Sequence, residues 1–533
     1  MAILILIIIA LVLGGIGWYK VLPALNIHSI GVWMFILFLL IFISAIYTLV
    51  RVAKKKNSNK IVKCLWGSVG VVIVLFIILL ISSSTIFRSK TYANRINVEE
   101  GEFKEDIPVV EDIKNIPLMD TKSAKKLGNR VVGSLTDVVS QYNVSDNYTT
   151  ICYKGEVRKI ATLEYASFFK YFNNKSKGIP GYVIVNPRNN EAEFVRLDKG
   201  IQYSPSAYFS KNLKRKLRTT YLTKIFGNYT FQIDDEGNPY WVVTCEEPNT
   251  FFSAYSPKEV ILLNAVTGES KIYKIEDVPE WVDYVYDGGT VEELYDSYGT
   301  LSNGYFNSLF AQKGCKETTD DYGYLIQDDD VYVYTGVTST TSDESNLGFI
   351  LVNSRTGKFK YYEMSGAEEY SAMSAAEGVV QNYGYKASFP SLINMDGEAT
   401  YVMVLKDNNG LVKLYAMVNV KNYTIVSTGE TLNEALKNYK TALVSAGKKV
   451  DSNNINADNI ETKEIKITDI KFLTVEGETI CYIKSEDGMC FKQKFEQNEK
   501  LILFNVNDVV EISYDKESSK DDIIDILDIK KKD

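Results

Sequence analysis

The sequence predicts three N-terminal transmembrane helices, then α+β repeat units built from antiparallel hairpins with helices, and a small C-terminal β-barrel of the OB-like or SH3-like kind. Three observations predict this fold. Residues 1–87 are almost entirely apolar, four later stretches share one hairpin pattern, and the last segment alternates short apolar strands with turn residues. These changes of sequence pattern along the chain predict transmembrane helices (1–87), an acidic linker (88–117), a repeated region (118–445), a second linker (446–463) and the small barrel (464–533).

Three apolar segments, 2–19, 30–50 and 65–87, fill the N-terminal part of the chain. Each approaches or exceeds the roughly 20 apolar residues that a helix needs to cross the hydrocarbon core. The first segment lacks the basic start and the cleavage site of a signal peptide, so we expect a permanent anchor. No Asp, Glu, Lys or Arg lies inside any segment, whereas ion paths and proton relays need such residues. We therefore expect an anchor or a packing surface for partner helices, and not a transporter or pump.

The charges of the loops predict the orientation. The loop between the second and third segments contains six basic residues, whereas the loop before it has only Lys20 and His28. The positive-inside rule then places residues 51–63 and the N-terminus in the cytoplasm and residues 88–533 outside. Three basic residues after the third segment would favour the opposite orientation; they are Arg88, Lys90 and Arg95. We expect a multi-pass protein of the cell membrane with an extracytoplasmic C-terminal region. The six basic residues are Arg51, Lys54, Lys55, Lys56, Lys60 and Lys63.

The acidic linker has the composition of a solvated spacer, which we favour over a cation site at residues 96–117. Beyond it, Asp120 is a candidate helix cap, and apolar residues recur at helical spacing after it. The sequence therefore predicts a helix over 121–142.

A weak internal repeat is the most informative feature of the soluble region. Four stretches share an apolar run that ends in Asn, two further residues, a turn pair and a second strand. Asn and Gly at these places favour the conformations that reverse a strand, so each stretch is predicted to be a β-hairpin. The stretches are 182–186 with Asn189-Asn190, 261–264 with Thr267-Gly268, 349–353 with Thr356-Gly357, and 415–419 with Asn422-Tyr423.

The last three hairpins have an extra strand before them, at 240–243, 331–334 and 400–404, and a helix signal after them. The signal is the Ser/Thr-x-x-Glu capping box. The predicted unit is therefore strand, hairpin and helix, and its copies would form an α+β architecture. The three capping boxes are Thr290/Glu293, Ser365/Glu368 and Thr431/Glu434.

A short helix followed by antiparallel strands with this Asn/Asp-x-x-Thr-Gly turn resembles the PepSY module of bacterial extracytoplasmic and membrane proteins. Residues 260–273 and 348–362 carry the resemblance best, and 182–197 and 413–427 carry it less well. It covers at most 118–445. The resemblance implies a binding or regulatory module that acts on an extracytoplasmic peptidase or on assembly. The whole chain, with its Gly-Ala-Glu-Glu-Tyr-Ser-Ala-Met stretch, is also similar to uncharacterised Gram-positive membrane proteins.

The C-terminal segment follows a linker rich in Asn, Asp, Lys and Ser. Turn pairs such as Glu476-Gly477 and Asp487-Gly488 separate short strands, a pattern typical of a small closed barrel. The chain has a net charge of −8 and no basic stripe, so we expect no nucleic-acid binding. The predicted strands are 465–473, 478–484, 489–495, 500–504, 508–514 and 522–529.

The cysteines indicate neither a disulfide framework nor a zinc site. None of the six shows Cys-x-x-Cys spacing, and the five in the soluble part are an odd number. We expect buried, unpaired thiols. One bridge between Cys481 and Cys490, on a shared hairpin, stays open as the exception.

The sequence contains no recognisable catalytic arrangement. The single histidine, His28, lies beside the second membrane segment, so a triad cannot form in the soluble region. We expect no catalytic, cofactor-binding or metal-binding residues and no cofactor. Three Ser-x-x-Lys pairs are attributed to chance, and the acidic runs are expected to be solvated turns, with weak Ca²⁺ binding and catalysis as alternatives. These features are Ser123/Lys126, Ser445/Lys448, Ser513/Lys516, Asp234-Asp235-Glu236, Asp320-Asp321 and Asp328-Asp329-Asp330.

A basic run precedes three apolar residues in the middle of the chain. We expect it to be a solvated helix face, with contact to anionic lipid or wall polymer as the alternative. The run is Lys211, Lys214, Arg215, Lys216 and Arg218, followed by Tyr221, Leu222 and Phe226.

The function expected from these patterns is that of a membrane-anchored binding, scaffold or regulatory protein of the bacterial cell envelope. Its expected partners are the lipid bilayer and other envelope or membrane proteins. The alternative is a cell-envelope hydrolase that uses Asp or Glu carboxylates, because two acidic residues at a defined separation suffice for glycoside hydrolysis.

Overall fold

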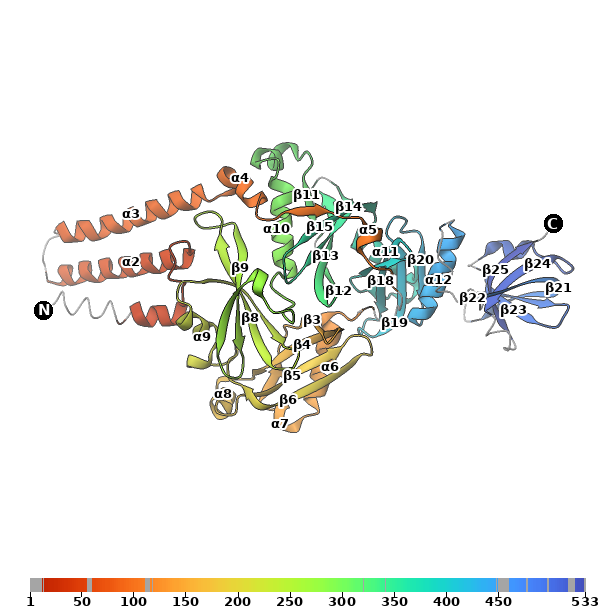
Figure 1. Cartoon of the computed structure of the whole chain (residues 1–533), viewed down its shortest axis with the longest axis horizontal. Coiled ribbons are helices and arrows are strands. Elements are labelled where there is room, and N and C mark those ends of the chain that lie inside the picture. Colours follow the sequence, from red (N-terminus) through yellow and green to blue (C-terminus); the bar gives the residue numbers. More distant parts are fainter. Residues whose placement is uncertain are drawn as a thin grey trace.

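The computed structural model describes residues 12, 14–54, 60–110, 116, 118–319, 321–340, 342–446, 448, 460–475, 478–495, 498–515 and 523–531. Two apolar helices lie near the N-terminus, and a mostly β-sheet region follows them (Figure 1). The helices are α2 (Ile30–Ala53) and α3 (Lys60–Ser82), and both are long and apolar enough to cross a membrane. Only 11% and 6% of their most apolar windows are buried, so they are not core helices of a soluble domain.

The first predicted membrane segment, 2–19, lies mostly outside the described residues; its described part, 14–19, belongs to a helix that continues to Val21. The two apolar helices α2 and α3 pack against each other. The indole N–H of Trp66 on α3 donates to Thr48 Oγ1 on α2 at 3.2 Å, and the rings of Trp33 and Phe76 lie 6.2 Å apart. The described residues thus hold a helical hairpin that fits a membrane protein.

The segment after α3 is ordered along the soluble region. It forms α4 (Thr85–Ala93), β1 (Val98–Glu100) and α5 (Phe103–Asp106). Strand β1 pairs in parallel with β15 (Phe359–Gly366), and Phe103 is buried in a hydrophobic core. The expectation of a solvated spacer is therefore wrong for this stretch, because its apolar residues outweigh the acidic ones in fixing its place.

Four antiparallel sheets of similar plan follow, and each runs as a meander of neighbouring strands. The first contains β2 (Tyr142–Val144), β3 (Thr149–Tyr153), β4 (Glu156–Tyr165), β5 (Ile179–Asn186) and β6 (Glu191–Ile201). The second contains β7 (Ile225–Ile233), β8 (Pro239–Pro248), β9 (Tyr255–Asn264) and β10 (Ser270–Lys274). The third contains β11 (Lys316–Thr318), β12 (Gly323–Gln327), β13 (Asp330–Ser339), β14 (Ser342–Asn353) and β15, beside β1. The fourth contains β16 (Lys386–Ala387), β17 (Ser391–Met395), β18 (Glu398–Lys406), β19 (Val412–Asn419) and β20 (Val426–Gly429).

All four predicted hairpins are present, as β5–β6, β9–β10, β14–β15 and β19–β20. The repeated Asn explains why. Its side chain accepts hydrogen bonds from backbone N–H groups two or three residues later, which closes the turn. Asn264 Oδ1 accepts from Val266 and Thr267, and Asn353 Oδ1 accepts from Arg355 and Thr356 in the same way.

The helices begin at side-chain caps, although two of the three predicted capping boxes are wrong. Thr431 caps α12 as predicted, and Asp120 caps α6. Helix α10 is capped by Asp287, and α11 by Glu368, because a carboxylate accepts from the first free N–H groups as well as a hydroxyl does. The helix predicted over 121–142 is shorter than expected. The helices of the soluble region are α6 (Thr121–Gly133), α7 (Thr136–Val139), α8 (Phe168–Asn174), α9 (Leu213–Thr220), α10 (Gly288–Leu301), α11 (Glu369–Val379) and α12 (Leu432–Ser445).

Helix α10 packs on the third sheet and α11 on the fourth, and both sheets come after their helix in the chain, whereas α12 packs on β19 and β20 of the fourth sheet, which come before it. The predicted order of strand, hairpin and helix is therefore present at β18, β19–β20 and α12, whereas α10 and α11 each precede the sheet on which they pack. The sheets share cores in pairs. Residues of the first and second sheets form one buried cluster, including Val183 and Ile261, and those of the third and fourth form another, including Phe349 and Tyr401.

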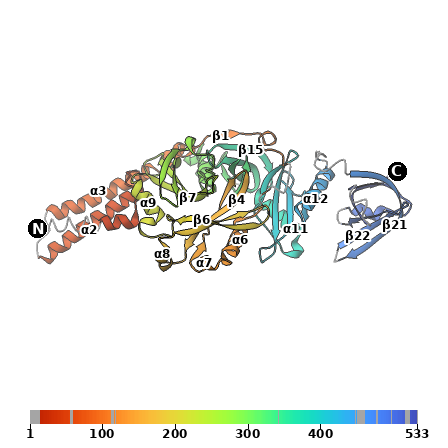
Figure 2. The ribbon, with the colours of Figure 1, turned by 60° about the horizontal axis from the view of Figure 1, so that its bottom comes forward.

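The C-terminal segment is a circuit of five strands at the end opposite the membrane helices (Figures 1 and 2). Each strand pairs with two others, in the order β21-β22-β23-β25-β24 and back to β21. The strand predicted at 500–504 is wrong, because Glu499–Leu503 is a 3₁₀ helix that buries Leu501. The strands are β21 (Ile460–Val475), β22 (Glu478–Ser485), β23 (Cys490–Lys494), β24 (Val509–Asp515) and β25 (Ile524–Lys531).

Candidate functional site

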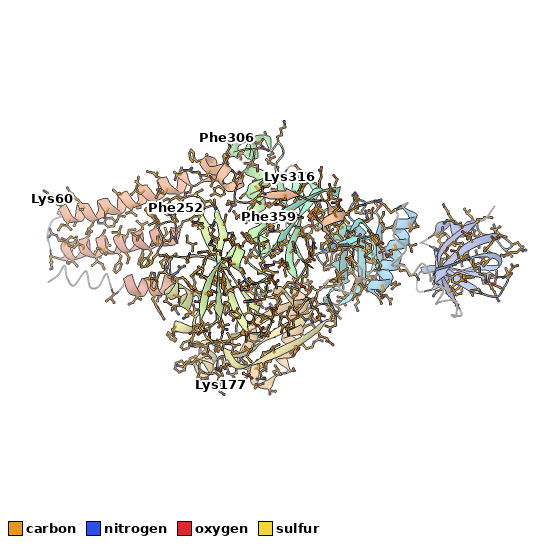
Figure 3. All side chains as sticks on the ribbon, in the orientation of Figure 1. Lys60, Lys177, Phe252, Phe306, Lys316 and Phe359 are labelled. Atoms are coloured by element: carbon orange, nitrogen blue, oxygen red, sulfur yellow. The ribbon has the colours of Figure 1, made fainter. Side chains whose placement is uncertain are left out.

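The loop between β8 and β9, residues 249–254 and here called the tip loop, contacts both apolar helices, α2 and α3. Phe252 is buried, and its ring lies 5.7 Å from Trp33 of α2 and 5.3 Å from Phe76 of α3. Phe251 lies 4.8 Å from the ring of His28. Figure 3 labels Phe252 where the helices meet the sheets. The second sheet is thus wedged into the end of the helical hairpin.

Polar contacts fix the tip loop at the end of α3. Phe252 N donates to Ser83 Oγ at 3.2 Å. The hydroxyl of Ser253 donates to the Ser83 carbonyl at 2.9 Å, and the hydroxyl of Tyr92 donates to Ser253 Oγ at 2.6 Å. A buried N–H without a partner costs free energy, so Ser83 both stabilises the loop and sets its position.

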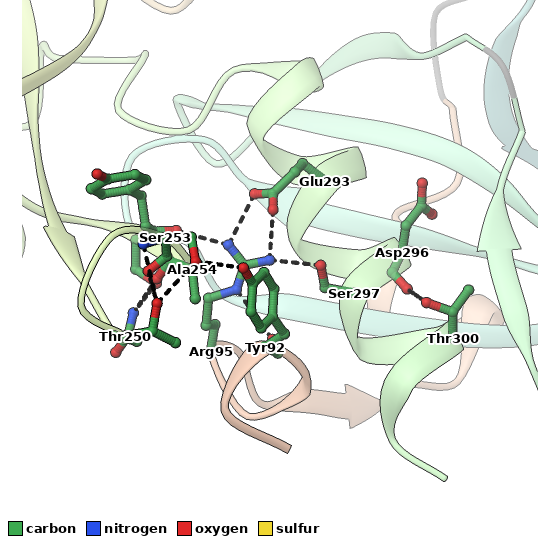
Figure 4. A network of polar contacts seen from close by, with 12 residues as sticks. Tyr92, Arg95, Thr250, Ser253, Ala254, Glu293, Asp296, Ser297 and Thr300 are labelled. Carbon is green, nitrogen blue, oxygen red and sulfur yellow. Dashed lines mark hydrogen bonds and ion pairs between the residues drawn. The ribbon is translucent and has the colours of Figure 1, made fainter. Parts of the chain in front are cut away.

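Arg95, just after α4, joins three elements in what we call the arginine network (Figure 4). Its side chain is only 1% exposed. The guanidinium forms a two-pronged ion pair with Glu293 of α10, at 2.7 and 3.0 Å. It also donates to Ser297 Oγ and to the Tyr255 carbonyl, at 2.7 and 2.8 Å. Arginine suits this site because its planar donors point in several directions at once.

The chain just before α2 is held by α9 and the segment after it. Arg218 is buried, and its Nε donates to the Leu22 carbonyl at 3.1 Å. Leu25 N donates to the Leu222 carbonyl at 2.8 Å. The expected solvated helix face is therefore wrong for Arg218, although Lys214 of the same run is exposed. Together the tip loop, the arginine network and this contact dock the sheets on the N-terminal helices, and we call them the junction.

A cleft of about 250 Å³ lies beside the arginine network. Its lining includes Arg95, Glu99, Tyr286 and Lys358. The Arg95 donors are already engaged with Glu293, Ser297 and backbone carbonyls, so the cleft presents one cation and one anion and no concentrated charge.

The residues that the sequence singled out for chemistry have structural partners. In the Ser-x-x-Lys pairs, Lys126 donates to the Asn409 carbonyl and Lys448 to Glu398, whereas Lys516 lies outside the described residues. Asp330 holds Arg355, and Asp234 accepts from Asn238 N in its own turn.

The cysteines are free thiols, as expected; of those in the soluble part, Cys245, Cys315 and Cys481 are buried as predicted, whereas Cys152 and Cys490 are only half-buried. The bridge left open between Cys481 and Cys490 is not formed, because these residues stand opposite Gln493 and Lys484 on the hairpin. Among the residues that the structure describes, no group of three or more His, Cys, Asp or Glu side chains is placed to hold a metal ion.

Sequence patterns missed buried acids, and one of them is Glu369 on α11. Its Oε1 accepts from Gly336 N at 2.7 Å, and its Oε2 accepts from Thr319 Oγ1 at 3.1 Å. Burial raises the pKa of this carboxyl to about 7. The carboxyl group links the third sheet to the helix of the fourth, and the side chain has no exposed surface. Its position one residue after a capping Glu was the only signal in the sequence.

Comparison with models of known protein families found no match to this chain, and comparison with curated proteins found none.

Proposed function

We propose that the chain is a membrane-anchored binding or scaffold protein of the bacterial cell envelope. One observation carries the proposal: Phe252 is buried between Trp33 and Phe76, while Ser83 holds its backbone. The membrane helices and the sheets therefore form one docked body rather than an anchor on a flexible stalk. Such a body presents its binding surfaces at a fixed height above the bilayer.

The proposed topology has three membrane helices with the soluble region outside. The basic loop at 51–63 supports a cytoplasmic position for that end of α2 and α3. The opposite end of the hairpin carries the junction and the sheets. The helix at 14–21 supports a third span, because its Tyr19 ring lies 4.2 Å from the Arg215 guanidinium at this same end.

Two fold resemblances support binding rather than chemistry. Helix-then-sheet units with an Asn-x-x-Thr-Gly turn support the PepSY-like interpretation of 118–445. The five-strand circuit supports an OB-like or SH3-like barrel at 464–533, folds that commonly carry binding faces. The partners that fit are other envelope or membrane proteins.

The rival hydrolase needs two carboxylates that open into one groove. Glu369 has the pKa of an acid catalyst, but it is enclosed and both oxygens are engaged. Asp330 and Asp234 are engaged in holding turns. The positions of these three acids support the scaffold.

Crosslinking and affinity purification of the full chain from native membranes tests the proposal. Ile512 is buried in the core of the C-terminal strands. We expect one reproducible set of envelope or membrane proteins with the natural chain and with Ile512→Val, and its loss with Ile512→Asp. Identical recovery with all three chains would contradict a binding role for this segment. Hydrolysis of a cell-wall polymer by the purified chain would favour the rival.

A further inference from the structure

A cluster of exposed aromatic side chains lies beside the junction, and we call it the aromatic patch. It comprises Phe168, Phe169 and Phe172 of α8, with Tyr208 and Phe209. Phe169 is 75% exposed and Phe209 55%. The rings touch one another, since Phe168 lies 5.0 Å from Tyr208 and 6.4 Å from Phe209. Contiguous aromatic surface of this kind marks a contact with a partner or a membrane.

The patch is continuous with the N-terminal helix. Phe209 has a positive φ of 54°, which is strained for an aromatic residue. Arg215 holds it, because its Nη1 donates to the Phe209 carbonyl at 2.8 Å. The same guanidinium lies over the ring of Tyr19, 4.2 Å from its centre. One side chain therefore links the patch to a helix at the membrane end of the molecule, and Figures 1 and 2 both place α8 and α9 at that end of the sheets.

The two chain segments that carry the patch have only basic residues among their charged side chains. Residues 166–178 and 202–224 contain nine Lys and Arg and no Asp or Glu, although the whole chain has a net charge of −8. Lys175 lies over the Phe172 ring, 3.9 Å from its centre, and Lys177, which Figure 3 labels, is exposed two residues further along the chain. Aromatic rings surrounded by basic side chains match the interface of an anionic bilayer, where rings sit among headgroups and cations bind phosphate.

We propose that the aromatic patch rests in the headgroup layer of the bilayer that α2 and α3 cross, with the surrounding lysines on anionic lipid. This inference rests on the membrane anchoring in the proposed function. It adds a fourth contact to the three of the junction: the first sheet lies on the lipid surface, while the tip loop of the second sheet packs between the helices. The patch would then fix the tilt of the soluble region relative to the membrane plane.

Site-directed spin labelling of the full chain in nanodiscs of phosphatidylglycerol and phosphatidylcholine tests this contact. The background replaces the three accessible cysteines with Ser, at Cys64, Cys152 and Cys490. One nitroxide is placed at Phe169→Cys, or at Phe172→Cys if the first variant fails to fold. The control label is at Tyr383→Cys. Tyr383 is 64% exposed and lies near the fourth sheet, away from the apolar helices α2 and α3.

We expect the ratio of oxygen to nickel-chelate accessibility to be several-fold higher at the patch than at the control. Replacing Lys170, Lys175 and Lys177 with Gln should lower the ratio in these nanodiscs. A patch label as open to nickel chelate as the control would overturn the inference. Low accessibility to both reagents would overturn it too, because another protein or a second copy would then cover the patch. Release of the chain from membranes by alkaline carbonate would overturn both the proposed membrane anchoring and the lipid contact of the patch. If the chain stays in the membrane but the patch label is exposed to water, only the lipid contact is overturned.

Discussion

Ser83, directly after the apolar helix α3, holds the backbone of Phe252, which lies 169 residues further along the chain: Phe252 N donates to Ser83 Oγ at 3.2 Å. The Phe252 ring then fills the space between Trp33 and Phe76. Phe252 thus makes a polar contact through its backbone and an apolar contact through its ring. The two contacts together fix the position and the orientation of the tip loop relative to α2 and α3. The predictions below follow from this arrangement.

Phe252→Ala should loosen the junction. Deleting a buried Phe ring costs about 3–5 kcal/mol, because transfer energy is lost and a cavity remains. We expect a lower midpoint in a thermal melt of the purified chain in detergent. Phe310→Ala is the matched control, since Phe310 is 76% exposed. Equal shifts for the two variants would show that the tip loop does not support the fold.

Arg95 and Glu293 should respond unequally to removal, although they form one ion pair. Arg95→Ala leaves the Tyr255 carbonyl without its donor, which costs roughly 1–3 kcal/mol for each such buried group. Glu293 is 57% exposed, and without it Arg95 keeps its hydrogen bonds to Ser297 Oγ and the Tyr255 carbonyl, so we expect Glu293→Ala to cost less than Arg95→Ala. Urea unfolding of the two single variants and the double variant measures both costs and their coupling. A larger loss from Glu293→Ala would contradict the proposed role of Arg95.

Glu369 should make stability fall as pH rises. Burial raises its pKa from 4.5 to about 7, so the folded chain retains a proton that the unfolded chain releases between these values. Stability is then lost as pH rises through this window, by on the order of 3 kcal/mol in total. Melts of the natural chain and of Glu369→Gln at about pH 5 and about pH 8 should show a smaller pH effect in the variant. Glu269→Gln, at an exposed residue, should leave the natural pH effect unchanged. An equally steep pH effect in Glu369→Gln would place its origin elsewhere.

The C-terminal segment should fold without the rest of the chain. Its core contains Ile467, Phe491 and Ile512, all fully buried. Residues 460–533 expressed alone should give a β-type circular dichroism spectrum and a cooperative melt of modest stability, because the segment is near the lower size for an independent core. Ile512→Asp would bury an unpaired charge, which costs several kcal/mol in order of magnitude, and should abolish the transition. A natural segment without β signal would show that it depends on the preceding sheets.

The sequence predicted what depends on neighbouring residues. The four hairpins follow from an Asn that bonds its own turn, as Asn264 and Asn353 do. The predicted caps of α10 and α11, Thr290 and Ser365, are wrong because the nearby carboxylates of Asp287 and Glu368 cap these helices instead. The strand expected at 500–504 failed because apolar residues at short spacing also fit a 3₁₀ turn.

The junction could not be predicted, because its contacts join residues far apart in the chain. Arg95 and Glu293 are separated by 198 residues, and no local pattern pairs them. One signal was present in the tip loop, where two adjacent Phe residues occupy a turn between predicted strands. Apolar residues at a hairpin tip indicate a contact with another element. Only part of the aromatic patch could be predicted. The basic run is visible in the sequence, but the position of that run beside Phe168 and Phe169 depends on the fold.

The central claim is that the docked soluble region lies on the extracytoplasmic side of the membrane, and cysteine labelling in intact cells tests it most directly. Ser140 is exposed and follows α7. A Ser140→Cys variant, made in a chain with Cys64, Cys152 and Cys490 replaced by Ser, is treated with a membrane-impermeant maleimide before and after lysis. The account predicts full labelling before lysis. Protection of this cysteine until the cells are lysed would contradict it.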